Sequence, residues 1–435
     1  MIDLAPYRAA LSGHKLLEPL GTVTRAVGLA VEVAGVSASI GELCAIRPRG
    51  GGEELLAEVV GFHDDTLLLM PLGDLRGIEP GSHVRRAPHP QLVPVGPGLL
   101  GRVVDALGNP MDGKGPLTDV RYVPMRTAPP AALERPTIHE HLTTGVRTID
   151  GVLTCGVGQR VGIFAGSGVG KSTLMGMIAR GASTECNVIG LVGERGREVQ
   201  DFIEKQLGEE GMRRSVLVVA TSDQPALLRL KAAWMATAIA EEFREAGSHV
   251  LLLLDSVTRV AMAQREIGLA VGEPPALRGY TPSVFALLPR LLERSGMSAK
   301  GAVTAFYTVL VEGDDMNEPV ADTVRGVLDG HIVLARALAA ENIYPAIDIS
   351  HSISRVMTDV TTPAHQSAAA RLRDALATYE RHHDLIAIGA YVHGSSPSID
   401  AALALHPKIM AFRRQNQAQL EPFDRSVKAL DEATW

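Results

Sequence analysis

The chain has 435 residues with 46% hydrophobic and 21% charged residues, which is ordinary for a globular protein of two or three domains. Its net charge of −7, without a long basic run, argues against a dedicated nucleic-acid binder and leaves only a local basic channel open. Its three cysteines do not suggest a disulfide framework, the first residues lack a secretory signal, and no apolar run reaches the ~20 residues that span a bilayer. We therefore expect a cytoplasmic protein whose membrane association comes through partners.

Short β segments separated by turns occupy the first part of the chain. They lie at residues 21–27, 55–62 and 66–72. Short strands at regular spacing predict a small barrel or sandwich, and a cluster of prolines ends it. We assign residues 1–90 to this N-terminal β-barrel and the proline-rich residues 91–136 to an extended connector.

Strands and helices alternate in residues 137–364, which we assign to a central domain. Apolar runs typical of buried parallel strands lie at residues 161–165, 187–192, 216–220, 250–254, 303–309 and 331–335. A long helical pattern starts after Pro225 and ends at Gly247. Strand signals then vanish, and helical patterns at residues 366–381 and 399–419 predict a C-terminal helical domain, residues 365–435. The predicted fold class is α/β.

A phosphate-binding P-loop is the strongest signal in the sequence. The residues from Ala165 to Ser172 read AGSGVGKS, with an apolar run before them and a helical pattern after them. Glycines let backbone N–H groups curl around phosphate oxygens, and the helix adds its positive N-terminal end. Lys171 would reach the β- and γ-phosphates and Ser172 would hold Mg²⁺. The predicted nucleotide-binding residues are Gly166, Ser167, Gly168, Val169, Gly170, Lys171, Ser172 and Thr173. The usual first glycine is replaced by Ala165.

Two carboxylates are expected at the same site. Asp255 ends an apolar run; in P-loop enzymes such a strand runs beside the P-loop strand, and its acid holds Mg²⁺ directly or through water. Glu194 follows the next apolar strand after the P-loop, so a parallel sheet brings it to the same edge. We interpret Glu194 as the group that activates the attacking water. The alternative, an acid that balances a helix dipole, fits Glu198 better.

Cleavage of a triphosphate also needs positive charge in the transition state. Arg259, shortly after Asp255, could reach the site. A second arginine could come from a neighbouring subunit, as an arginine finger, which spacing alone does not locate.

Longer stretches of the sequence resemble the α/β subunit family of rotary ATPases. Residues 345–355, PAIDISHSISR, look like the signature of that family, and residues 101–113, GRVVDALGNPMDG, are similar to its strand entering the nucleotide domain. Within the family, the sequence is most similar to the export ATPases of flagellar and injectisome type III secretion systems. The stretches that carry this likeness are FAGSGVGKS at 164–172, AMAQREI at 261–267, GEPP at 272–275 and FYTVLVEGDDM at 306–316.

The resemblance implies a homohexameric ring whose RecA-like P-loop domains bind each nucleotide between two subunits. It implies Glu194 as the catalytic carboxylate and Asp255 at the metal. It also places Arg195 and Arg259 near the γ-phosphate.

The same resemblance makes Arg355 the finger that reaches the adjacent subunit. From the residues alone, an ion pair between Arg355 and Asp348 within one chain is the alternative. The family often places an aromatic side chain against the adenine shortly after this segment. Gln366 stands about there in this chain, and Tyr391 of the C-terminal domain is the other candidate.

The function implied is a ring ATPase that uses ATP and Mg²⁺ to energise protein export by releasing or unfolding chaperone-bound substrates at the inner-membrane export apparatus. Export-gate and stalk proteins and export chaperones would be its partners, nucleic acid is not expected, and a flagellar system is favoured. One alternative is a ring-shaped RNA-dependent helicase of the transcription-terminator type, against which the acidity and the 4% aromatic content argue. The other is a subunit of a rotary ATP synthase; Glu194 argues against a non-catalytic one.

Overall fold

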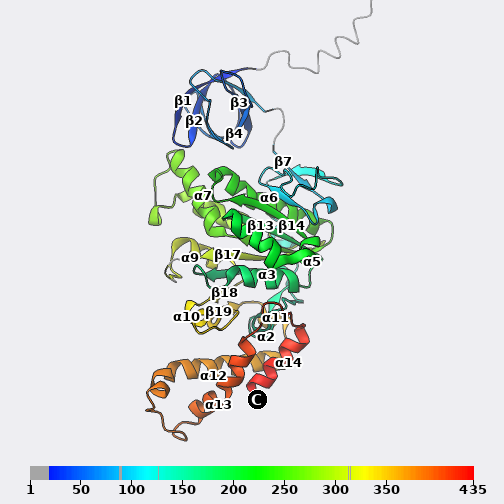
Figure 1. Cartoon of the computed structure of the whole chain (residues 1–435), viewed down its shortest axis with the longest axis vertical. Helices are drawn as coiled ribbons and strands as arrows, with labels where there is room; N and C mark the ends of the chain where they lie inside the picture. Colours follow the sequence, from blue (N-terminus) through cyan, green and yellow to red (C-terminus); the bar gives the residue numbers. More distant parts are fainter. Residues whose placement is uncertain (1–18, 88–90, 126, 312, 314) are drawn as a thin grey trace, which may run out of the picture.

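The computed structural model describes residues 19–87, 91–125, 127–311, 313 and 315–435. A closed β-barrel lies at one end of its long axis, a sheet covered by helices lies in the middle, and a group of helices lies at the other end (Figure 1). This architecture confirms the predicted fold class. The start of the chain, where we expect no secretory signal, lies outside the described residues, as do Glu312 and Asp314 of the stretch 306–316. Every helix in the described part is too short or too polar to cross a membrane.

The barrel closes in the antiparallel order β1-β2-β5-β4-β3-β6. Its strands are β1 (Gly21–Val27), β2 (Ala30–Ala34), β3 (Leu43–Arg47), β4 (Leu55–His63), β5 (Thr66–Pro71) and β6 (His83–Arg86). Alternate residues such as Val31, Val33 and Leu69 point into a dry core, because successive side chains of a strand face opposite sides. The three strands expected from the sequence are β1, β4 and β5.

Residues 91–136 contribute to the folded core, which an extended connector would not do. β7 (Leu92–Val95) pairs with β9 (Arg121–Pro124), and β8 (Val103–Asp105) joins the central sheet parallel to β14. Val104 is fully buried there. Strands this short give almost no periodic signal, which is why the prolines dominated the sequence pattern. Short elements complete this stretch and the next: η1 (Pro97–Leu99), η2 (Ala132–Glu134), β10 (His141–Leu142), α2 (Arg147–Val152) and β11 (Cys155–Gly156).

The central sheet has the order β19-β18-β12-β17-β15-β13-β14-β8. Its further strands are β12 (Arg160–Ala165), β13 (Cys186–Glu194), β14 (Ser215–Thr221), β15 (His249–Asp255), β17 (Ala302–Leu310), β18 (Gly330–Leu334) and β19 (Ile347–Ser354), with β16 (Gly296–Met297) paired to β17. The six predicted apolar runs are all parallel strands of this sheet. One expectation is wrong: the strand ending in Asp255 does not run beside the P-loop strand, because β17 lies between β15 and β12.

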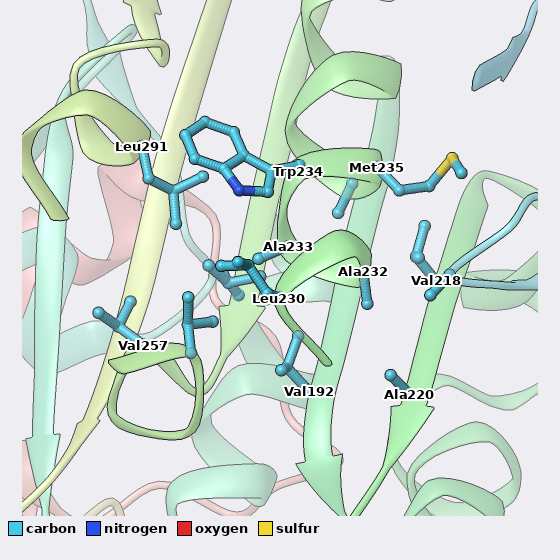
Figure 2. Close-up of a cluster of buried hydrophobic side chains, with 14 of the residues drawn as sticks. Val192, Val218, Ala220, Leu230, Ala232, Ala233, Trp234, Met235, Val257 and Leu291 are labelled. Atoms are coloured by element: carbon cyan, nitrogen blue, oxygen red, sulfur yellow. The ribbon is translucent and has the colours of Figure 1, made fainter. Parts of the chain in front are cut away.

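Helices cover both faces of the sheet (Figure 1). They are α3 (Lys171–Gly181), α4 (Gly196–Asp201), η3 (Phe202–Leu207), α5 (Gly208–Arg213), α6 (Ala226–Glu245), α7 (Val257–Ala270), η4 (Leu277–Gly279), α8 (Pro282–Leu292), α9 (Pro319–Val327), α10 (Arg336–Ala340) and α11 (Met357–Val360). The predicted helix after Pro225 is α6. Figure 2 shows its apolar residues, Leu230 and Ala233 among them, packed with Val192 of β13 and Val257 of α7. This packing fixes the strand ends that carry the site.

Three helices form the C-terminal part: α12 (Pro363–Ala387), α13 (Pro397–Arg413) and α14 (Phe423–Thr434). The helix predicted at residues 399–419 corresponds to α13, which ends at Arg413, earlier than expected. The Gln415 N–H donates to the carbonyl of Tyr344 at 2.8 Å, outside any helix. Residues 414–422 thus return to the central domain before α14 begins.

Candidate functional site

The P-loop connects the buried strand β12 to α3. Gly168 and Gly170 have φ values of +80° and +93°, a region that favours glycine, and Lys171 is the first residue of α3. No side chain in the described part of the chain caps the start of α3, which leaves its first N–H groups available to an anion. Ala165 is the last residue of β12 and packs in the core, which explains why glycine is not required there. Val169 is buried as well, whereas Ser167 and Ser172 are exposed.

Lys171 lies between the two predicted carboxylates. Its Nζ forms an ion pair with Asp255 and lies 3.6 Å from Glu194 Oε1. Asp255 Oδ1 also accepts a hydrogen bond of 2.6 Å from Thr308 of β17. The strand register explains the cluster, because Leu191 of β13 pairs with Asp255 of β15 and both strands end at the same edge.

Burial and neighbouring charge set the protonation of this cluster. Burial, reinforced by the negative charge of Asp255, raises the pKa of Glu194 to about 7, against the opposing effect of Lys171. A hydrogen bond with Glu194 lowers the pKa of Glu198. Burial alone would lower the pKa of Lys171, but Asp255 and Glu194 outweigh it and the pKa is raised. Lys171 therefore stays charged while Glu194 titrates near neutral pH.

Arg259 lies at the cluster, whereas Arg195 does not. A Cβ on Gly193 would come within 2.9 Å of the Arg259 side chain, so Arg259 lies directly over the residue before Glu194. Its Nε is buried without a hydrogen-bond partner in the described part of the chain, and its Nη1 lies 3.8 Å from the sulfur of Met262. Arg195 is 82% exposed, and its one ion pair among the described residues is with Glu198 at 3.7 Å.

Arg355 lies at the opposite edge of the sheet from the P-loop. β19 runs antiparallel to β18 and pairs Ser354 with Gly330, the first residue of β18. The Arg355 N–H donates to the carbonyl of Asp329 at 3.0 Å, and the Asp329 carboxylate binds Arg160, the first residue of β12. Arg355 is therefore near the start of β12, and the P-loop follows its end.

This distance excludes contact between Arg355 and the P-loop of its own chain. The six residues of β12 span roughly 16–20 Å, more than an arginine side chain reaches. The Arg355 side chain is exposed and has no hydrogen bond or ion pair within the described ranges. The alternative pair with Asp348 does not form, because Asp348 Oδ2 lies 2.9 Å from His351 Nδ1 instead.

Neither predicted adenine residue lies at the P-loop. Gln366 lines a pocket of about 520 Å³ beside Ser354, at the Arg355 edge, and donates to the carbonyls of Thr358 and Thr361. Tyr391 donates to Asp400 at 2.8 Å and so closes the loop between α12 and α13. The structure therefore brings neither predicted adenine residue to the P-loop of its own chain, because Gln366 lies with the nearby finger segment at the opposite edge of the sheet.

A different pocket, of about 450 Å³, adjoins the P-loop. It is lined by Gly168, Gly170, Thr173, Leu174, Met177, Tyr344, Pro345, Gln415, Asn416 and Gln417. The Tyr344 ring lies close to Gly170: a Cβ atom on Gly170 would be 3.6 Å from the ring. Tyr344 is 42% exposed. Sequence reasoning missed Tyr344, although it directly precedes the signature stretch 345–355 and is an aromatic residue at a strand entrance.

Comparisons with known proteins agree with this geometry. Residues 145–354 match the model of the ATP synthase alpha/beta family, nucleotide-binding domain; residues 23–87 match that family's beta-barrel domain; and residues 361–432 match the T3SS EscN ATPase C-terminal domain. The chain is 56% identical to a flagellum-specific ATP synthase of Bacillus subtilis over 95% of both proteins. The chain belongs to the flagellar and type III secretion ATPases of the ATP synthase alpha/beta family.

Other relatives give the same result. A type 3 secretion system ATPase of Xanthomonas euvesicatoria is 51% identical over 95% of this chain and 94% of its own. The assembled ATPase EscN of enteropathogenic E. coli superposes with a TM-score of 0.91 at 44% identity, covering 95% of this chain and 100% of EscN. The predicted family and the predicted ATPase activity are confirmed, which decides against the ring helicase. Flagellar and injectisome relatives both match, so the choice between these systems stays a prediction.

We expect ionisation of Glu194 to limit kcat/KM for ATP, which reports the free enzyme. Below the Glu194 pKa of about 7 the protonated carboxyl cannot accept a proton from water, so kcat/KM should fall about tenfold per pH unit on the acid side. Steady-state kinetics between pH 5.5 and 8.5 measure this.

The control is Glu198→Gln. The Glu198 charge helps to raise the Glu194 pKa, so its removal should move the acid limb of the profile to lower pH. An acid limb that stays in place in Glu198→Gln, or a flat profile in the unmodified protein, would contradict the assignment.

Proposed function

We propose that this ATPase works as a homohexameric ring in which each ATP lies between two subunits. The observation that carries the proposal is the position of Arg355 at the far edge of the sheet from its own P-loop, exposed and unpaired among the described residues. A head-to-tail ring brings that edge of one subunit to the P-loop edge of the next. The assembled structures of EscN, one of them with its central stalk EscO, support an oligomer of this kind.

At the phosphates, Lys171 is the residue that must change partner. Without nucleotide its charge is neutralised by Asp255 and Glu194. A bound triphosphate offers stronger charge-assisted bonds and draws Lys171 away from the carboxylates. The N–H groups that open α3 then surround the same phosphates.

Two side chains beside the P-loop could bind a magnesium ion once Lys171 has moved to the phosphates. Asp255 and the exposed hydroxyl of Ser172 are oxygen ligands, and Mg²⁺ is usually held by one or two side chains together with phosphates and water. No cluster of three His, Cys, Asp or Glu side chains in the described ranges could hold a metal by itself, which supports a cation that arrives with the nucleotide. The ion would neutralise charge on the β- and γ-oxygens.

Water attack is assigned to Glu194, with two guanidinium groups stabilising the transition state. Glu194 accepts the proton of the attacking water once it is ionised. Arg259 from the same subunit and Arg355 from the neighbour supply the positive charge that the terminal phosphate needs as its bond breaks. The adenine occupies the pocket between Tyr344 and residues 415–417, where the aromatic ring offers a stacking face.

Hydrolysis then drives motion in the C-terminal helices. The pocket wall at residues 415–417 lies in the segment that joins α13 to α14, so closure around ATP and reopening after cleavage move these helices. We infer that this motion releases or unfolds chaperone-bound export substrates beside export-gate and stalk proteins, at the inner membrane but held there by partners. The acidic chain supports a protein cargo and no nucleic acid.

We favour a flagellar system, on the 56% identity to the Bacillus subtilis flagellar relative against 51% to the Xanthomonas type 3 secretion relative. Introducing the chain into a strain that lacks its flagellar ATPase should restore motility, and Lys171→Ala should not. Restoration of type III effector secretion without restoration of motility would contradict the flagellar assignment.

Mixing two inactive variants tests the shared site. Lys171→Ala lacks the phosphate-binding group and Arg355→Ala lacks the finger, so each alone should have less than about 1% of normal turnover, since a finger contributes ~10³-fold or more. In an equimolar mixed ring about a quarter of the interfaces pair an intact P-loop with an intact finger, because a head-to-tail interface uses two different surfaces. ATPase activity should therefore return on mixing.

The matched control mixes Lys171→Ala with Glu194→Ala. Both changes lie on the P-loop side of the interface, so no intact site forms and no activity should return. Failure of the first mixture to regain turnover, with mixed rings verified by cross-linking, would refute the shared site.

A further inference from the structure

One buried side chain fastens the pocket wall at residues 415–417 to the central domain. Gln415 is 5% exposed. Its Nε2 donates to the carbonyls of Gly145 and Gln419, both at 2.8 Å, and its Oε1 accepts from the Arg147 N–H at 2.8 Å. Both side-chain donors and the acceptor are therefore engaged, which fixes the rotamer as well as the position.

The backbone of Gln415 reaches the opposite wall of the same pocket. Its N–H donates to the carbonyl of Tyr344 at 2.8 Å. The two walls that face the predicted adenine position are thus joined through this residue. No other residue of the described chain hydrogen-bonds both to Tyr344 and to the α2 entrance.

The turn at Thr144 and Gly145, to which Gln415 donates a hydrogen bond, is held firmly by other contacts. Asp150, fully buried, accepts hydrogen bonds from the N–H groups of Thr144 and Gly145 at 2.8 and 3.1 Å and from the Thr144 hydroxyl at 2.6 Å. A Cβ on Gly181, the last residue of α3, would lie 2.4 Å from the Thr144 carbonyl, so this turn packs directly on α3. The P-loop directly precedes the same helix. The position of Gln415 is therefore fixed relative to the P-loop through α3.

Two arginines hold the rest of the segment. The Arg147 guanidinium donates to the carbonyl of Phe412 at 3.3 Å and to Glu421 at 3.1 Å, so it bridges the end of α13 and the approach to α14. Arg180 donates to the Gln417 carbonyl at 2.7 Å. These contacts tie the backbone on either side, but neither arginine contacts Tyr344 in the described part of the chain.

We propose that Gln415 is a positioning residue for the base end of ATP: it fixes Tyr344 and residues 415–417 as the two walls that hold the adenine. The inference rests on the proposed function of the P-loop pocket. Gln415 has no hydrogen bond to Lys171, Glu194 or Asp255 in the described part of the chain, so we expect its influence to fall on the affinity that depends on the base. A residue with a merely structural role would affect all ligands of the site alike.

The test is Gln415→Met, which keeps the volume and removes the three side-chain hydrogen bonds. KM for ATP should rise about tenfold, corresponding to ~1.4 kcal/mol, with kcat within about twofold. Competitive inhibition by magnesium pyrophosphate, which has no base, should be unchanged. Gln419→Met is the matched control: the same change in the same segment, at an exposed side chain that does not line the pocket, should leave KM as it is.

An unchanged KM for ATP in Gln415→Met, or equal weakening of ATP and pyrophosphate, would overturn the inference. Should this variant not fold, hydrogen exchange of the unmodified protein decides: amides of residues 415–421 should be protected by magnesium ADP and not by magnesium pyrophosphate, and equal protection would overturn it. Loss of the proposed function itself is distinguishable, because the unmodified protein would then fail to hydrolyse ATP or to be inhibited by pyrophosphate.

Discussion

The length of one strand separates Arg355 from the P-loop of its own chain, and the proposed mechanism depends on this separation. β12 leads from Arg160, beside Arg355, to the P-loop, and its six residues keep the finger and the phosphate site of one chain at opposite edges of the sheet. In the proposed mechanism, a triphosphate bound to a single chain lacks one of the two guanidinium groups that stabilise its cleavage. In the proposed ring the neighbouring subunit supplies that group, which couples hydrolysis to assembly.

Charge balance within one chain stabilises the cluster of Lys171, Asp255 and Glu194. Lys171 compensates two carboxylates, the buried Asp255 and the half-buried Glu194, that would otherwise repel one another. Burial keeps the Glu194 pKa near 7, so part of the repulsion is also relieved by a proton. In the proposed function, these same groups bind the phosphates and activate the attacking water. Under that proposal, nucleotide binding exchanges ionic partners within the cluster.

The parts of the site that the sequence predicts well are local ones. The P-loop is one continuous motif, and Glu194 and Asp255 each end a recognisable apolar run, so their type and edge followed from the pattern. The order of strands did not follow, because insertion of β17 between β12 and β15 depends on packing between distant segments. β8 has three residues, too few for a periodic pattern in the sequence to indicate a strand. Tyr344 and Gln415 are 71 positions apart, from 344 to 415, and only the fold reveals their hydrogen bond.

The most direct test of a finger donated by the neighbour is the specific ATPase activity of the unmodified chain as a function of its concentration, with assembly followed by sedimentation. Activity per chain should rise steeply as rings form and be nearly absent in monomers. Full activity per chain at concentrations where only monomers sediment would contradict it.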